Sequence, residues 1–94
     1  MDKEEKLELL KQDLQRKTKA NDEYLKTLLE LAEKRIQREG IVLEEKDIEI
    51  QMAVVQYAAY LFRKRDAPDT SMPRYLRKSL NDILFSQKGK AYDV

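Results

Sequence analysis

The chain of 94 residues contains no cysteine, no histidine and no tryptophan. Without cysteine there is no disulfide framework, no thiol nucleophile and no thiolate metal site. Without histidine the chain lacks the commonest general base and the commonest metal ligand, which excludes conventional zinc sites and histidine-dependent catalytic triads. Only two glycines and two prolines are present, too few for the many turns of an all-β fold.

A strong excess of one charge is also missing, since the formal net charge is +1. The charge is unevenly distributed along the chain. Residues 1–62 carry 11 basic and 14 acidic side chains, whereas residues 63–94 carry 8 basic and 4 acidic ones. There is therefore no global basic field for nucleic acid, but the two parts of the chain differ in sign.

Long apolar runs are absent as well. The longest, Met52–Phe62, is interrupted by Gln56 and is far shorter than the ~20 residues that a membrane-spanning helix needs. The N-terminal residues, Met1–Lys6, are charged and precede no apolar run, so we expect no targeting segment. The 41% of apolar residues suffices for one modest core in a single domain.

What is present is helical periodicity. Apolar residues recur three and four positions apart, which predicts an all-α single domain, a small bundle of about four helices. The expected helices cover residues 3–16, 22–39, 47–65 and 72–87, with a loop over 66–71 and a mobile tail over 89–94.

Individual helices differ in the width of their apolar stripe. The first has a narrow stripe of leucines, Leu7, Leu10 and Leu14. The second starts after Asn21 as N-cap and ends at Gly40, and its stripe is Leu25, Leu28, Leu29, Ala32 and Ile36. The third is apolar almost all round, with Ile48 in its main stripe, which predicts a central helix packed on several sides. The fourth is expected to end at Gly89, and the segment Ile41–Leu43 to tuck beneath the bundle.

Neighbouring carboxylates are the candidates for acid–base chemistry. They are Glu4–Glu5, Asp22–Glu23 and Glu44–Glu45. Such pairs need a buried cleft to work as acid and base, whereas these lie at expected helix starts or in a loop, where capping and solvation explain them. We therefore expect no enzyme, and no catalytic, cofactor-binding or metal-ligating residues.

A basic cluster brackets the expected loop. The candidate subunit or partner interface consists of Arg63, Lys64, Arg65, Met72, Pro73, Arg74, Tyr75 and Arg77. Arginine and tyrosine are enriched at protein interfaces, and basic groups with aromatics also hold nucleic acid. A solvated surface, a protein interface and a nucleic-acid contact all remain open for this cluster.

The spacing of apolar residues along the whole chain carries a family resemblance. It rests on the spacing of Leu10–Lys11, Leu14, Asp22, Leu25, Leu28–Leu29, Ala32, Ile36 and Gly40, on the run Ala53–Leu61 with its basic end, and on Met72–Pro73, Leu76 and Leu80. This pattern resembles the head–tail connector (adaptor, or head-completion) proteins of tailed phages and prophages, and extends from about Leu7 to Phe85. It departs from the family at Arg16–Lys17, where a short apolar residue is expected to close the first helix.

The resemblance implies a structural virion assembly protein. Such proteins are all-α and form a homo-oligomeric ring under the portal protein, where they offer a platform for the tail and its completion protein. DNA passes through the lumen without sequence readout. The implied location is the bacterial host cytoplasm during assembly and then the head–tail junction of the virion. The loop Asp66–Met72 and the basic cluster are expected to face a neighbouring subunit or the portal.

Two other functions fit the composition. One is a small nucleic-acid-binding regulator, whose recognition helix would present Arg74, Arg77, Lys78 and Asn81. The other is a tail-assembly chaperone, which would bind a tail protein and no portal.

Overall fold

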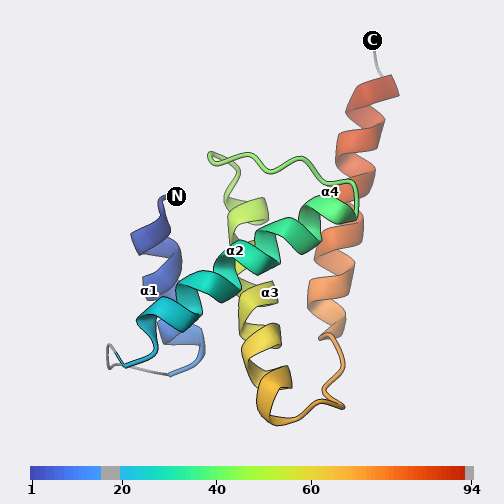
Figure 1. Cartoon of the computed structure of the whole chain (residues 1–94). Helices are drawn as coiled ribbons and strands as arrows, with labels where there is room; N and C mark the ends of the chain where they lie inside the picture. The colour runs from blue at the N-terminus through green and yellow to red at the C-terminus, as the bar shows by residue number, and fades with distance from the viewer. Residues whose placement is uncertain (16–19, 93–94) are drawn as a thin grey trace.

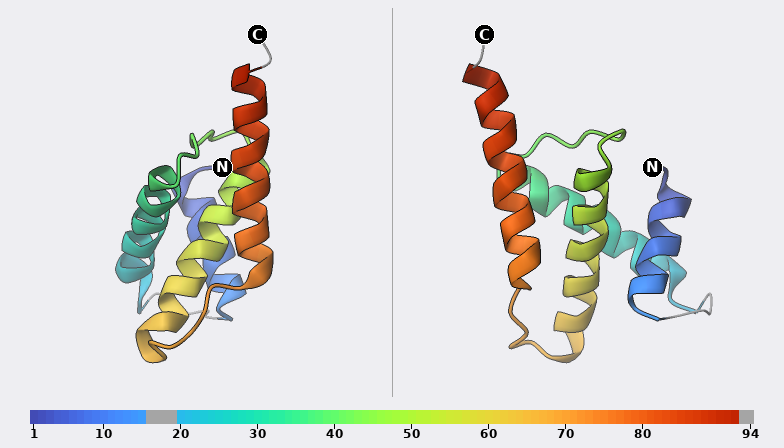
Figure 2. Two further views of the ribbon diagram at one scale, coloured as in Figure 1. Left: turned by 90° about the vertical axis from the view of Figure 1, so that its right-hand side faces the viewer. Right: turned by 180° about the vertical axis from the view of Figure 1, so that it is seen from behind.

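The computed structural model describes residues 1–15 and 20–92, and over these residues the chain forms four helices and no strand. They are α1 (Lys3–Asp13), α2 (Asp22–Arg38), α3 (Ile48–Asp66) and α4 (Arg74–Tyr92). In Figure 1, α2 crosses in front of α3, with α1 near one of its ends and α4 near the other. Seen from behind, α3 lies between α1 and α4 (Figure 2). The all-α bundle predicted from the sequence is confirmed.

The helix starts use the capping chemistry that their sequences offer. The Asp2 carboxylate accepts a hydrogen bond of 2.8 Å from the Glu5 backbone N–H at the start of α1. Asp47 accepts hydrogen bonds from the backbone N–H groups of Glu49 and Ile50 at the start of α3, at 3.0 and 3.3 Å. Asn21 occupies the N-cap position of α2 as predicted, but its side chain makes no capping hydrogen bond. The start of α2 is therefore stabilised by the acidic residues of its first turn instead.

The apolar stripe of α2 is confirmed, because all five of its predicted residues are buried. α3 packs against each of the other helices, most extensively against α2. Its apolar residues are not buried all round, however: Ile48 is 68% exposed, and Met52 and Leu61 are only partly buried. The predicted central apolar helix is therefore not confirmed, and Ile48 was wrongly assigned to the core.

Several helix ends differ from the sequence prediction. α1 ends at Asp13 rather than near residue 16, because Leu14 closes the last turn and Gln15 then adopts a left-handed backbone with φ of 57°. The predicted connection over residues 16–19 lies outside the described residues. α3 is shifted by one residue, to 48–66, and α4 begins at Arg74 rather than at 72 because the Pro73 carbonyl accepts the first helical hydrogen bonds.

The largest difference concerns the end of α4. Gly89 was predicted to end this helix, with a mobile tail after it, but the helix continues to Tyr92. Gly89 keeps a right-handed backbone, whereas Gly40, which does end α2, has φ of +99°. A glycine ends a helix only where the backbone turns left-handed, and the residues that flank Gly89 are mostly good helix formers. Residues 93–94 lie outside the described residues.

The segment between α2 and α3 only partly follows the prediction that it tucks beneath the bundle. Ile41 is buried and Leu43 is partly buried, but Val42 is 66% exposed. The Val42 backbone N–H donates to Gln87 Oε1 at 2.9 Å, and Gln87 Nε2 donates to the Val42 carbonyl at 2.8 Å. This two-way amide contact attaches the segment to α4.

Candidate interaction surfaces

The predicted basic cluster lies where α3 ends and α4 begins, around the link over residues 67–73. Two of its arginines contact the chain's own helices. Arg63 Nη2 donates to the Asp13 carbonyl at 3.1 Å, and its Nη1 lies 3.6 Å from Asp13 Oδ2. The Arg65 guanidinium lies 5.0 Å from the centre of the Tyr24 ring, a cation–π contact with α2. Arg63 and Arg65 therefore hold α1 and α2 to α3 rather than standing free for a partner.

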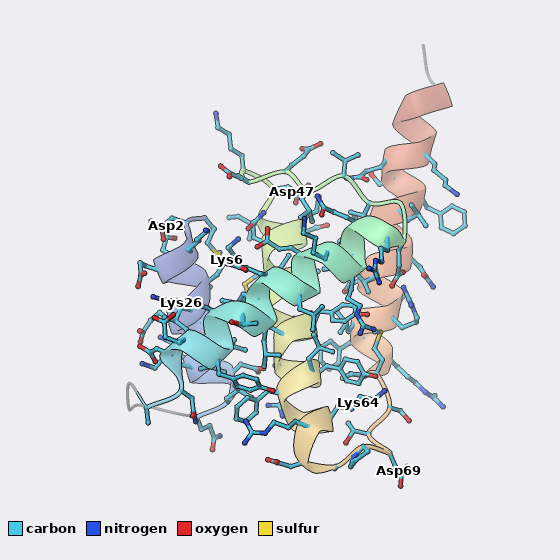
Figure 3. The ribbon with its side chains drawn as sticks, in the orientation of Figure 1. Asp2, Lys6, Lys26, Asp47, Lys64 and Asp69 are labelled. Atoms are coloured by element: carbon cyan, nitrogen blue, oxygen red, sulfur yellow. The ribbon has the colours of Figure 1, made fainter. Side chains whose placement is uncertain are left out.

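Lys64 and Met72 also make contacts within the chain. Lys64, labelled in Figure 3, donates to the Tyr60 hydroxyl at 3.1 Å and lies 5.4 Å from the Tyr60 ring centre. Its ammonium group has no carboxylate partner among the described residues. Met72 is partly buried against the hydrophobic core, and Pro73 beside it is also partly buried.

The members of the cluster that lie on α4 differ from one another in exposure. Arg77 forms an ion pair and a hydrogen bond with Glu39, which follows α2. Arg74 is exposed and has no hydrogen bond or ion pair within the described ranges. Tyr75 is 55% exposed. The eight predicted residues therefore differ in exposure and in contacts, and Arg74 and Tyr75 are the two exposed members that make no hydrogen bond, ion pair or ring contact among the described residues.

Phe85 and Lys88 extend the exposed surface of α4 beyond the residues predicted from the sequence. The core-facing residues of this helix are Leu76, Leu80 and Ile83. On its solvent side, exposed residues recur at alternating intervals of four and three, which places them in one row. We call this row the α4 stripe; it consists of Arg74, Lys78, Asn81, Phe85 and Lys88. Phe85 is 75% exposed, and basic residues lie on both sides of it along the row.

α1 has the opposite character on its solvent side. Two of its lysines are buried: Lys6 Nζ lies 3.7 Å from Glu33 Oε1, and Lys11 Nζ lies 3.0 Å from Asp22 Oδ1. The exposed residues that remain along the helix are mostly acidic. Apart from Lys3 in the first turn, they are Glu4, Glu5, Glu8, Gln12 and Asp13, which we call the α1 edge.

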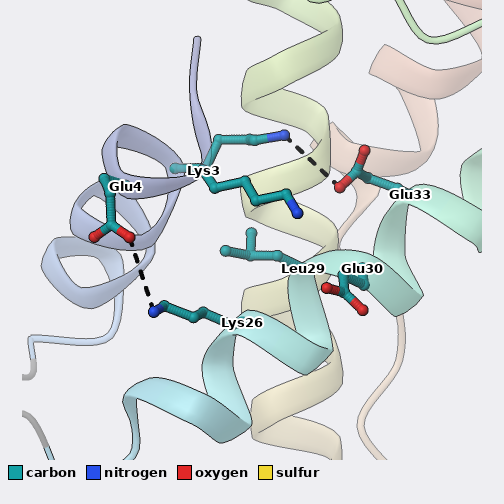
Figure 4. Close-up of a pocket in the computed structure, with 7 residues that line it drawn as sticks. Lys3, Glu4, Lys26, Leu29, Glu30 and Glu33 are labelled. Atoms are coloured by element: carbon teal, nitrogen blue, oxygen red, sulfur yellow. Dashed lines mark ion pairs between the residues drawn. The ribbon is translucent and has the colours of Figure 1, made fainter.

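A shallow pocket lies between α1 and α2 (Figure 4). Its lining residues are Lys3, Glu4, Lys6, Lys26, Leu29, Glu30 and Glu33. Lys26 Nζ lies 3.8 Å from Glu4 Oε1, and Lys6 pairs with Glu33. Because basic and acidic side chains alternate and pair with each other, the pocket favours neither an anion nor a cation.

A second hollow lies between α3 and α4. Ile48, Met52 and Ile83 supply its apolar lining, and polar groups such as Gln56 and Asp82 complete it. No cluster of three or more potential metal-ligating side chains occurs within residues 1–15 and 20–92. In that same part of the chain, no helix is long and apolar enough to cross a membrane.

Comparison with protein-family models, with curated proteins and with solved structures finds no match to this chain.

Proposed function

We propose that this chain is a structural subunit of a tailed-phage or prophage head–tail connector, which assembles as a ring under the portal protein and offers a platform for the tail. The observation that carries the proposal is the α4 stripe. Phe85 is 75% exposed on a helix that projects past the rest of the bundle. An exposed large apolar side chain within a polar rim is typical of a protein–protein contact.

The arrangement of the core supports the same function. The residues that carry the family resemblance include Leu10, Leu25, Ile36, Leu76 and Leu80, and all of these are buried. They build the scaffold, and the charged side chains around them are left for contacts with neighbours. On this proposal the mechanism is assembly rather than catalysis.

The experiment is assembly of the purified chain, alone and with tailless capsids that carry a portal. We expect annular particles by negative-stain electron microscopy, or binding of the chain to the capsids followed by tail attachment. The variant Phe85→Ser should reduce assembly at least tenfold while its circular dichroism spectrum stays helical. Leu31→Ser, at a residue 39% exposed on α2, is the matched control and should assemble normally.

The basic cluster itself is a poor place for such a test. Charge reversal at Arg63 would also break its contact with Asp13 and loosen α1. Arg74→Glu avoids this problem, because Arg74 has no bonded partner among the described residues. Failure of the wild-type chain to bind portal-bearing capsids would overturn the connector proposal.

A nucleic-acid-binding regulator is the second candidate, and one observation favours it. Arg74, Lys78, Asn81 and Lys88 share the exposed side of one helix, and such groups contact phosphates and bases. This function requires duplex binding that weakens steeply with salt. The variant Lys88→Gln should then lower DNA affinity, whereas Phe85→Ser should leave the salt dependence unchanged. Absence of DNA binding at low salt would exclude this candidate.

A further inference from the structure

The α1 edge and the α4 stripe lie on opposite sides of the molecule. α1 and α4 flank α3 on its two sides (Figures 1 and 2). The molecule measures 48 × 30 × 18 Å along its principal axes. A copy placed beside the first in the same orientation therefore brings the α1 edge of one copy near the α4 stripe of the other.

The α1 edge is acidic because of where its lysines point. Lys6 and Lys11 are buried against acidic residues of α2 at 3.7 and 3.0 Å, so they neutralise Glu33 and Asp22 rather than their own helix. The carboxylates of Glu5 and Glu8 are left exposed, with no basic partner in the described part of the chain. The edge therefore presents uncompensated negative charge one helical turn apart.

The α4 stripe is basic for the converse reason. Arg74 and Lys88 have no carboxylate partner within the described ranges, and Lys78 has only an exposed contact of 3.5 Å with Asp82. Such an exposed pair contributes little and exchanges readily for another carboxylate. At 1.5 Å per residue the stripe is about 21 Å long from Arg74 to Lys88 and the α1 edge is about 14 Å long from Glu4 to Asp13, so the stripe is long enough to cover the whole edge.

We infer that the α1 edge of one copy of this chain packs against the α4 stripe of the next copy. Glu5 and Glu8 pair with the basic residues of the stripe, and Phe85 packs on Leu9, a partly buried apolar residue of α1. Two different surfaces meet in this contact, so it repeats head to tail and closes into a ring if the rotation between copies allows. The inference rests on the proposed function and names the surfaces that join its subunits.

Charge reversal tests this pairing directly. We expect the double variants Glu5→Lys with Glu8→Lys, and Arg74→Glu with Lys78→Glu, each to lose assembly, because one edge then repels its neighbour. A mixture of the two should assemble again, since each reversed edge meets a complementary one on the other variant. Mass by light scattering should fall to that of a monomer for each variant alone and rise on mixing. Lys34→Glu with Arg38→Glu, two exposed reversals on α2, is the matched control and should assemble as the wild type does.

Cross-linking gives an independent readout, because the natural chain contains no cysteine. Gln12→Cys with Asn81→Cys places one thiol on each surface, and oxidation should produce a ladder of covalent multimers.

Either double reversal variant that still assembles, or a mixture that stays monomeric, would overturn the pairing and leave the connector proposal intact. Assembly that depends on these edges without any binding to portal-bearing capsids would overturn the connector proposal and leave the pairing intact. A wild-type chain that is monomeric both free and on capsids would overturn the pairing.

Discussion

The two outer helices, α1 and α4, are attached to the rest of the bundle by different kinds of contact. α1 has 11 residues and buries Leu7 and Leu10 together with two lysines, and polar contacts then fasten it to its neighbours. α4 has 19 residues, buries Leu76, Leu80 and Ile83, and continues past the bundle. The short helix with a narrow apolar stripe gains part of its attachment from buried charges, whereas the longer α4 buries three large apolar residues and adds polar contacts from Arg77 and Gln87.

This difference also decides what each helix shows to solvent. Lys6 and Lys11 of α1 are buried in ion pairs with acidic residues of α2, so their positive charge does not reach the surface of α1. The surface of α1 that remains exposed is therefore mostly acidic. α4 carries Arg74, Lys78 and Lys88 on the side away from the core, with Phe85 among them. The internal packing of the two helices thus produces two exterior surfaces of opposite charge.

Truncating one core leucine in each helix tests whether both are equally docked. Leu10 and Leu80 are both fully buried, so Leu10→Ala and Leu80→Ala should each lower the free energy of unfolding by about 2–5 kcal/mol. Urea denaturation measures the loss. Because α1 is short, its amide protons should also lose protection from hydrogen exchange before those of α3 in the Leu10→Ala protein. Leu31→Ala, at a partly exposed residue, should change stability by less than about 0.5 kcal/mol. A loss of less than about 1 kcal/mol at Leu10 would contradict the docked position of α1.

Removing a buried charge from α1 tests the polar part of its attachment. Lys11→Met keeps the methylene packing but leaves Asp22 without its partner at 3.0 Å, and should cost about 1 kcal/mol. A double-mutant cycle with Asp22→Asn isolates the pair. The matched change on α4, Lys78→Met, removes an exposed contact of 3.5 Å with Asp82 and should cost less than about 0.5 kcal/mol. Equal losses at the two sites would mean that α1 does not depend on charge more than α4 does.

The side-chain amide of Gln87 tests how the C-terminal part of α4 is attached to the segment between α2 and α3. Gln87→Leu removes both hydrogen bonds to the Val42 backbone and should cost about 1 kcal/mol, because water replaces part of what is lost. The Val42 amide proton should exchange faster with solvent, while amides in the middle of α3 keep their protection. Gln37→Leu, at an exposed glutamine on α2, serves as the control. Unchanged exchange at Val42 would show that Gln87 does not hold this segment.

The core was largely predictable from the sequence because apolar spacing determines which side of a helix is buried. The stripe of α2 from Leu25 to Ile36 shows this, since each of its residues has neighbours three or four positions away that point the same way. Ile48 shows where apolar spacing alone fails to predict burial. It fits the periodicity of α3, but it stands in the first turn and lines the open hollow between α3 and α4, where it is left 68% exposed.

The surfaces were less predictable because their charges pair across long distances in the sequence. Arg63 contacts Asp13, 50 residues away, and that contact depends on where α1 docks. The inward lysines of α1 were also missed, since lysine is rarely buried unless it is paired. The exposure of Phe85 could have been predicted from the sequence. Once Leu76 and Leu80 are assigned to the core side of α4, the spacing of Phe85 from Arg74 and Lys78 places it on the opposite side of the helix.

The two glycines give the sharpest test, because the same substitution should change the free energy of unfolding in opposite directions at the two positions. Gly89 lies inside α4, and a Cβ built on it would meet nothing within 4 Å, so Gly89→Ala should raise the free energy of unfolding by about 0.5–1 kcal/mol. Gly40 has φ of +99°, and a Cβ there would lie 3.5 Å from Leu84 Cδ1, an ordinary contact. Gly40→Ala should therefore cost about 1–2 kcal/mol through backbone strain rather than through a clash. If Gly89 instead ended the helix in a left-handed turn, its substitution would be destabilising too. Urea denaturation and helicity by circular dichroism for the two variants therefore decide whether α4 continues past the bundle.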